Sequence, residues 1–180
     1  IVEFNPDAHV LYVYAERFVN DMVNALRNSR IEEFKQHYRS VDALLIDDIQ
    51  FLSNRERTQE EFFYTFEALL AARKQMVITS DTYPKELSSF QERLRSRFGS
   101  GLVIEIEPPE LELRVAILRK KGEQLLRERP EYPPLTDDVA LFIAQQVRSN
   151  VRDLEGALTR SLAYAMFHNL ELTEAVARDA

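Results

Sequence analysis

The sequence predicts an α/β fold, with a mostly parallel sheet flanked by helices, followed by a small helical bundle. Up to residue 109, short apolar runs alternate with amphipathic helical patterns, which is typical of parallel strands joined by helices. From residue 110 onward only helical periodicity is present. We therefore expect a partial α/β core at residues 1–109 and a helical subdomain at residues 110–180, with helices covering both faces of the sheet.

The first part alternates four predicted strands with helices. The strands are expected at Val10 to Ala15, Ala43 to Ile46, Met76 to Thr79 and Leu102 to Ile106. The helices carry apolar residues at helical spacing in the ranges 18–26, 31–38, 62–70 and 90–98. Ser29 with Glu32 and Thr58 with Glu61 have the spacing of a capping box. Pro84 marks the start of the last helix, and Gly99 or Gly101 marks its end.

The second part contains four predicted helices and no strand. They are Leu111 to Arg129, Val139 to Val147 after a Thr136 cap, Val151 to Phe167, and a short helix from Thr173. Three prolines between Pro130 and Pro134 form a turn between two of these helices rather than a domain linker.

Composition limits the classes of function. The 180 residues carry a net charge of −7, so any contact with nucleic acid must be local, as at the arginines between Arg93 and Arg97. The chain has no cysteine, which excludes disulfides and thiol catalysis and agrees with a cytoplasmic location. No apolar run is long enough for a transmembrane segment, and the residues after Ile1 do not form a signal peptide.

Two adjacent carboxylates, Asp47 and Asp48, follow the apolar strand Ala43 to Ile46. Open α/β sheets gather their ligands at the carboxyl ends of parallel strands. One carboxylate at this edge can hold Mg²⁺ while the other orients a water molecule. The pair also fits a core strand that leaves into an acidic loop, so on its own it leaves both interpretations open.

Three further segments follow this strand end in order. They are Thr79-Ser80-Asp81, an arginine-rich helix from Glu92 to Phe98, and Ser149 to Gly156 in the helical part. With these segments the chain resembles, over nearly its whole length, the AAA+ domain of the DnaA family of bacterial replication initiators. The resemblance implies an AAA+ core that lacks its N-terminal strand and P-loop, followed by a helical lid. The segments that match the family are Ala15 to Met22, Leu44 to Phe51, Thr79 to Asp81, Arg93 to Phe98, Pro108 to Glu112 and Ser149 to Leu158.

The resemblance assigns three acids to an ATP pocket. Asp47 matches the Walker B acid that holds Mg²⁺, and Asp48 matches the neighbouring acid that polarises the attacking water. Asp81 matches sensor 1, a polar group on the adjacent strand that registers the γ-phosphate; without the resemblance, Thr79 to Asp81 would be a capped strand end. The implied cofactors are ATP or ADP with Mg²⁺, and the implied activity of the intact protein is slow ATP hydrolysis.

Three arginines match further parts of such a pocket. Arg97 matches the arginine finger, which projects into the ATP site of the next subunit and neutralises charge on the γ-phosphate. Arg93, four residues earlier on the same helix face, matches a second interface arginine. Arg152 matches sensor 2, which reaches from the lid to the phosphates. Without the resemblance, these arginines would be interpreted as solvated surface residues.

The resemblance also implies contact with single-stranded DNA in the channel of an assembled filament. Arg55 and Arg57 match positions that can neutralise backbone phosphates, and Val23 could pack against a sugar or base. Val23 lies in an amphipathic helix and fits a core residue nearly as well. The implied partners are origin DNA, other copies of the chain in a nucleotide-dependent oligomer, the replicative helicase or regulatory proteins, and acidic phospholipids.

One departure from the family concerns the phosphate-binding loop. The sequence contains no G-x-x-x-x-G-K-[ST], and its four glycines cannot form one. In the family this loop lies just upstream of the position of Ile1, so we expect an internal fragment that begins directly after it. We expect such a chain to bind ATP poorly, to hydrolyse it negligibly and to leave strand edges unpaired, because the missing strand is central to the family sheet.

Other functions share parts of this pattern. A regulatory relative of the initiator or a helicase loader would contain the same AAA+ core. A phosphorelay receiver also holds Mg²⁺ with paired acids, but its final strand should carry a lysine, and Leu102 to Glu107 has none. A non-enzymatic interaction fragment without nucleotide chemistry is the alternative from another class.

Overall fold

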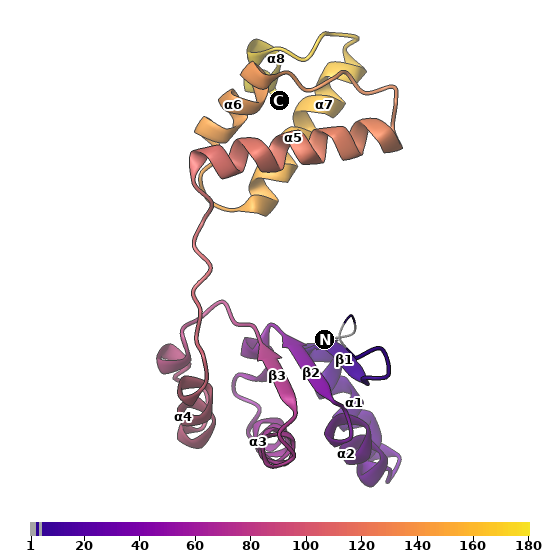
Figure 1. The fold of residues 1–180 in the computed structure, drawn as a ribbon, viewed down its shortest axis with the longest axis vertical. Helices are drawn as coiled ribbons and strands as arrows, with labels where there is room; N and C mark the ends of the chain where they lie inside the picture. Colours follow the sequence, from indigo (N-terminus) through magenta and orange to yellow (C-terminus); the bar gives the residue numbers. More distant parts are fainter. Residues whose placement is uncertain (1–2, 4) are drawn as a thin grey trace. The chain divides into compact units, whose positions relative to one another are not determined.

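The computed structural model describes residue 3 and residues 5–180 of the chain (Figure 1). The chain divides into two compact units, residues 1–104 and 105–180, each with its own hydrophobic core. The division falls in the segment 101–110, which contains no helix or strand. The expectation that the chain begins directly after a P-loop helix concerns the segment 1–5, of which residues 1, 2 and 4 lie outside the described residues.

The first unit is built on a parallel sheet in the order β1-β2-β3 (Figure 1). Its strands are β1 (Val10–Tyr14), β2 (Ala43–Asp47) and β3 (Gln75–Ile78). Helices α1 (Ala15–Arg27) and α2 (Ile31–Arg39) connect β1 to β2, and the 3₁₀ turn η1 (Ile49–Leu52) with helix α3 (Glu56–Ala71) connects β2 to β3. The predicted α/β class with a parallel sheet is therefore confirmed.

Helices of this unit bury one face of the sheet. Val13 and Ile46 are register partners on that face, and they are 2% and 1% exposed. On the other face Tyr12, Leu45 and Val77 form one register row, in which Tyr12 is 51% and Val77 45% exposed. Strand order follows chain order, and right-handed crossovers between such strands place their helices on the same side. For this reason the expected covering of both faces is not seen among residues 3 and 5–104.

Aromatic side chains fill the core beneath the sheet. Phe18 of α1 makes edge-to-face contacts with Phe34, Tyr38 and Phe62, at ring-centroid distances of 5.1, 4.8 and 5.5 Å. Such arrangements place the positive edge of one ring against the negative face of another and add to the energy of burial. These contacts hold α1, α2 and α3 in one packed layer, which fixes the ends of the strands they connect.

The last helix of this unit is shorter than predicted. Pro84 begins a separate 3₁₀ turn, η2 (Pro84–Glu86), and helix α4 (Glu92–Ser100) starts afterwards. Proline sets the backbone angle of a first helical turn, but here that turn does not continue into α4. Helix α4 ends at a Gly101 cap, at one of the two predicted glycines.

Three local predictions were wrong. Leu102 to Ile106 is not a strand, and Leu102 and Ile106 are 89% and 93% exposed, because no described strand lies beside this segment to complete its backbone hydrogen bonds. Ser29 does not cap α2; it has a positive φ of 55°, and Arg30 is the capping residue. Thr58 lies inside α3, which begins two residues earlier at Glu56.

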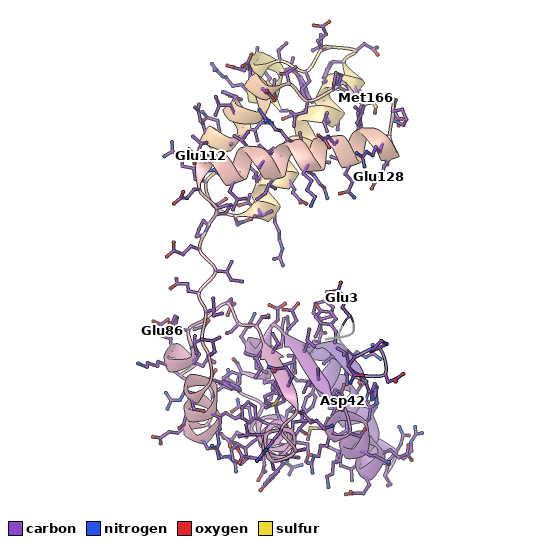
Figure 2. All side chains as sticks on the ribbon, in the orientation of Figure 1. Glu3, Asp42, Glu86, Glu112, Glu128 and Met166 are labelled. Atoms are coloured by element: carbon purple, nitrogen blue, oxygen red, sulfur yellow. The ribbon has the colours of Figure 1, made fainter. Side chains whose placement is uncertain are left out.

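The second unit is a bundle of helices, as predicted. They are α5 (Leu111–Glu128), α6 (Asp137–Gln146), α7 (Val151–Phe167) and α8 (Glu174–Asp179). Glu112 and Glu128 mark the two ends of α5 in Figure 2. The core of the bundle contains Leu118, Leu154 and Leu158, which are fully buried. None of the helices in the described part of the chain combines the length and apolar character needed to cross a membrane.

Candidate functional site

The carboxylate of Asp47, at the end of β2, lies between two hydroxyl groups. The Thr79 hydroxyl, directly after β3, donates to Asp47 Oδ1, and the Tyr12 hydroxyl of β1 donates to Oδ2 at 2.7 Å. The hydrogen bond to Asp47 raises the pKa of the Tyr12 phenol, because a phenolate would face the carboxylate charge. Tyr12 therefore stays protonated at neutral pH and remains a donor to Asp47.

Thr79 also determines the course of the chain after β2. Its backbone N–H donates to the carbonyl of Ile46, and its carbonyl accepts from the N–H of Ile49, both at 3.0 Å. Its hydroxyl oxygen accepts the N–H of Asp48, also at 3.0 Å. These bonds hold Asp48 in the left-handed region at φ 58°, a conformation that aspartate tolerates better than most residues. Thr79 thus binds the side chain of Asp47 and the backbone of Asp48 with the same hydroxyl group.

The part of the chain that the structure describes contains no group of three or more acids or histidines that could hold a metal ion by themselves, so Asp47 would need further ligands. Carboxylate oxygens are the ligands that Mg²⁺ prefers in proteins, and Asp47 presents two of them at the carboxyl end of the central strand. Asp48 is half-buried, and its Oδ1 accepts a hydrogen bond from Gln50 Nε2 at 3.0 Å, which restricts its side chain. The metal role of Asp47 and the water-orienting role of Asp48 stay predictions.

The predicted sensor residue Asp81 lies two residues beyond Thr79. It is exposed, and its Oδ1 accepts a hydrogen bond from the Thr82 hydroxyl at 2.8 Å. Of the residues in the Thr79 to Asp81 motif, Thr79 rather than Asp81 provides a hydroxyl that contacts Asp47. Its side-chain oxygen at a strand end was the one available signal. The role of Asp81 stays a prediction.

The predicted finger Arg97 and interface residue Arg93 both lie on α4, and both pair with acids of α3. Arg97 Nε lies 2.7 Å from Glu67 Oε1, and Nη2 donates to Oε2 at 3.0 Å. Arg93 Nη2 is 3.8 Å from Glu60 Oε1, and its guanidinium lies 4.4 Å from the ring centroid of Phe63. Both arginines therefore lie in the contact between α3 and α4, which we call the α3–α4 seam.

Gln59, on α3, connects this helix to the start of α4, and its role was not predicted from the sequence. It is 1% exposed, and its Nε2 donates to the carbonyls of Leu52 and Ser89 at 2.9 and 3.0 Å. Its Oε1 accepts the N–H of Gln91, the capping residue of α4, at 2.9 Å. A buried glutamine with every bond made inside the protein fixes where α4 begins. Nothing in the local pattern distinguishes it from exposed glutamines.

The three predicted DNA-contacting residues lie around the start of α3 and on α1. Arg55 is the capping residue of α3 and Arg57 lies in its first turn; both are exposed and line a hollow of about 490 Å³. Val23 is partly buried and packs against the core of the first unit. Helix α1 contacts η1, the turn that leads toward Arg55. The arginines are thus available to a ligand, and Val23 is shared between the core and the surface.

The predicted lid arginine Arg152 is exposed in the first turn of α7. That turn is fixed by its neighbours, because Asn150 Oδ1 accepts the N–H of Asp153 at 2.8 Å and Asp153 Oδ2 accepts the Ser149 hydroxyl at 2.5 Å. Such reciprocal caps stabilise a helix start by about 1 kcal/mol. Among the described residues, Arg152 makes no ion pair or side-chain hydrogen bond, so its guanidinium is available.

Comparisons with known proteins agree on one family. The model of the bacterial DnaA ATPase domain matches residues 1–105. The chromosomal replication initiator protein DnaA of Herminiimonas arsenicoxydans is 54% identical over 176 residues, which cover 98% of this chain and 37% of that protein. The chain therefore spans little more than a third of this relative's length.

Solved structures give the same result. Domain III of the Thermotoga maritima replication initiation protein DnaA matches with a TM-score of 0.88 and 41% identity, over 98% of this chain and 71% of that chain. A replication initiator DnaA bound to AMPPCP and single-stranded DNA matches with a TM-score of 0.77 and 34% identity, over 98% of this chain and 50% of that chain.

Proposed function

The chain belongs to the family of bacterial DnaA ATPase domains, and from this premise we propose that its intact protein is an ATP-dependent switch that assembles on origin DNA and promotes melting. The observation that carries the proposal is the Asp47 carboxylate at the carboxyl edge of the sheet, between the hydroxyls of Thr79 and Tyr12. That edge is where open α/β sheets bind nucleotides. The relative bound to AMPPCP supports nucleotide binding by the intact protein.

Within this proposal the two acids divide the work. When bound, Mg²⁺ with ATP would neutralise phosphate charge, and Asp47 would hold that metal. Asp48, whose carboxylate is restrained by Gln50, orients the attacking water and accepts its proton. Thr79 fixes the positions of both acids, since its hydroxyl group binds the Asp47 side chain and the Asp48 backbone. Asp81 serves as the sensor of the γ-phosphate beside them.

The arginines of α4 act on a second copy of the chain. Arg97 enters the neighbour's pocket and neutralises charge on its γ-phosphate, so that assembly depends on ATP rather than ADP. Arg93 contributes a second cation to the same interface, from one helical turn earlier. Arg152 contacts the phosphates from the lid. Hydrolysis then removes the group that these arginines recognise, and the assembly resets slowly.

Single-stranded DNA is the proposed ligand of the surface around Arg55, Arg57 and Val23. Two exposed arginines at a helix start can neutralise phosphates without reading bases, and the exposed part of Val23 can contact sugar or base. This local basic site functions in spite of the net charge of −7. The relative bound to single-stranded DNA supports such a site.

The test is the variant Arg97→Ala in the intact protein. ATP affinity should stay within about threefold, because the arginine belongs to the neighbour's pocket, whereas ATP-dependent assembly on origin DNA should be lost. Arg27→Ala removes the same charge from an exposed position at the end of α1 and should leave assembly intact. Light scattering with ATP and with ADP measures the effect. Normal assembly of the Arg97 variant would remove the finger assignment.

A further inference from the structure

Glu67, on α3, contacts the guanidinium of Arg97 with both carboxylate oxygens. Oε1 lies 2.7 Å from Nε, and Oε2 accepts a hydrogen bond from Nη2 at 3.0 Å. The single hydrogen bond from Nη2 and the short distance from Nε to Oε1 keep the guanidinium beside Glu67. The side chains are 33% and 43% exposed, so the pair is screened less than one fully in solvent.

The helices on either side hold this pair in place. Phe98, next to Arg97, packs against Phe62 and Phe66 of α3 and against Phe90, with ring centroids 6.3, 6.1 and 6.1 Å apart. Sliding α4 along α3 would break these contacts. Glu67 and Arg97 are therefore held close together by the packing of the two helices. The guanidinium of Arg97 can leave Glu67 only by a change of side-chain conformation.

The neighbouring arginine is held differently. Arg93 is 3.8 Å from Glu60, which is 52% exposed, and it also donates to Gln91 Oε1 at 2.8 Å and stacks on Phe63. Its position thus depends on three partners of different chemistry. Among the described residues, Glu67 is the only acid paired with Arg97. Removing one negative charge from α3 should therefore affect the two arginines unequally.

The charge of Glu67 opposes the role of Arg97 in a neighbour's ATP site. A guanidinium paired with a carboxylate has almost no net charge to offer a phosphate, and the carboxylate would stand beside the incoming anion. Two anions that compete for one cation repel each other, so both cannot be well satisfied at once. Contact of Arg97 with a γ-phosphate therefore competes with its contact to Glu67.

We propose that Glu67 is a positioning residue that retains Arg97 within its own chain and thereby raises the threshold for ATP-dependent assembly with a second copy. The inference rests on the proposed function, since it takes Arg97 as the arginine that enters the neighbour's site. Its new element is the competition between an acid of the same chain and the phosphate of another. The proposal makes assembly sensitive to a residue that touches neither nucleotide nor DNA.

The test uses Glu67→Gln in the intact protein, with ATP and origin DNA. The substitution keeps the shape of the side chain and removes the charge. The protein concentration at half-assembly should fall about threefold to fivefold, the range expected for a partly exposed ion pair. The gain should shrink as salt is raised, because salt already weakens the pair in the unchanged protein. A purely structural role of Glu67 would not give this salt dependence.

Two further variants separate the possible failures. Glu60→Gln removes the same charge from the same helix and should shift half-assembly less than twofold; an equal shift would overturn the proposal. An unchanged or raised concentration for Glu67→Gln would also overturn it, provided that Arg97→Ala has abolished assembly. If Arg97→Ala assembles normally, the proposed function itself fails, and the role of Glu67 fails with it.

Discussion

Replacing Gln59 by leucine tests how firmly α4 is attached to the rest of the first unit. The side chain has nearly the same volume as glutamine, so packing is preserved while three hydrogen bonds disappear. Two of them end on the carbonyls of Leu52 and Ser89, and the third is donated by the N–H of Gln91. Because Gln59 is 1% exposed, water cannot replace these bonds without opening the site.

The expected cost follows from the number of partners lost. Each intramolecular hydrogen bond contributes about 1 kcal/mol net, and a buried group left without a partner costs more. Three bonds therefore correspond to about 3 kcal/mol. That is a large share of the roughly 5–15 kcal/mol by which such domains are stable. If the loss is local, it corresponds to a roughly 100-fold fall in amide protection.

Hydrogen exchange of the intact protein, followed in peptides covering residues 88–98, measures this loss. The amides at the start of α4 should exchange roughly 100-fold faster in Gln59→Leu, whereas the bundle at residues 111–167 should be unaffected. Gln36→Leu places the same substitution on an exposed position of α2 and should change stability by less than about 0.5 kcal/mol. Equal protection in the two variants would show that Gln59 does not hold α4.

Two further predictions concern the ends of the sheet. Thr79→Val should lower ATP hydrolysis by the intact protein about 10-fold to 100-fold with little change in ATP affinity, because the two acids lose their common anchor. Thr79→Ser should retain activity, and a fully active valine variant would contradict the role of the hydroxyl. Asp42, labelled in Figure 2, accepts a hydrogen bond from Lys74 Nζ at 2.6 Å, and this bond holds the pKa of its carboxyl below the ordinary value of about 4. Because the pKa of Asp42 is lower in the folded than in the unfolded protein, its carboxylate stabilises the fold at pH values above the unfolded pKa. This stabilisation is lost as the pH falls through the folded pKa. The melting temperatures of the unchanged protein and of Asp42→Asn should therefore differ at about pH 6 and converge in acid.

Much of the fold could be predicted from the sequence because the signals were periodic. The apolar runs gave β1, β2 and β3, and helical spacing gave α5 and α7 to within a residue or two at each end. Leu102 to Ile106 shows the limit of this reasoning. Its alternation is that of a strand, but a strand also needs a neighbour, and none of the described strands lies beside it. An alternating pattern shows that a segment can form a strand, whereas the pairing of that strand depends on whether another strand lies beside it.

The site was predictable only where its residues formed recognisable motifs. Asp47 and Asp48 follow an apolar strand, which is a local signal. The contact between Tyr12 and Asp47 spans 35 residues and depends on the parallel register that pairs Tyr14 with Asp47. Glu67 is one of several acids on α3, and its pairing with Arg97 becomes visible only once α3 and α4 are packed together. Motifs identify the acids, and packing identifies their partners.

The α3–α4 seam favours one kind of movement over another. Shifting α4 would break three bonds of Gln59 and separate Phe98 from three other rings. Releasing Arg97 alone breaks one partly exposed ion pair, which is worth about 1 kcal/mol or less, and leaves the rest of the seam intact. The lower-energy route to a trans contact is thus rotation of one side chain on a fixed helix. A fixed α4 also keeps Arg93 beside Glu60 and Phe63 while Arg97 moves.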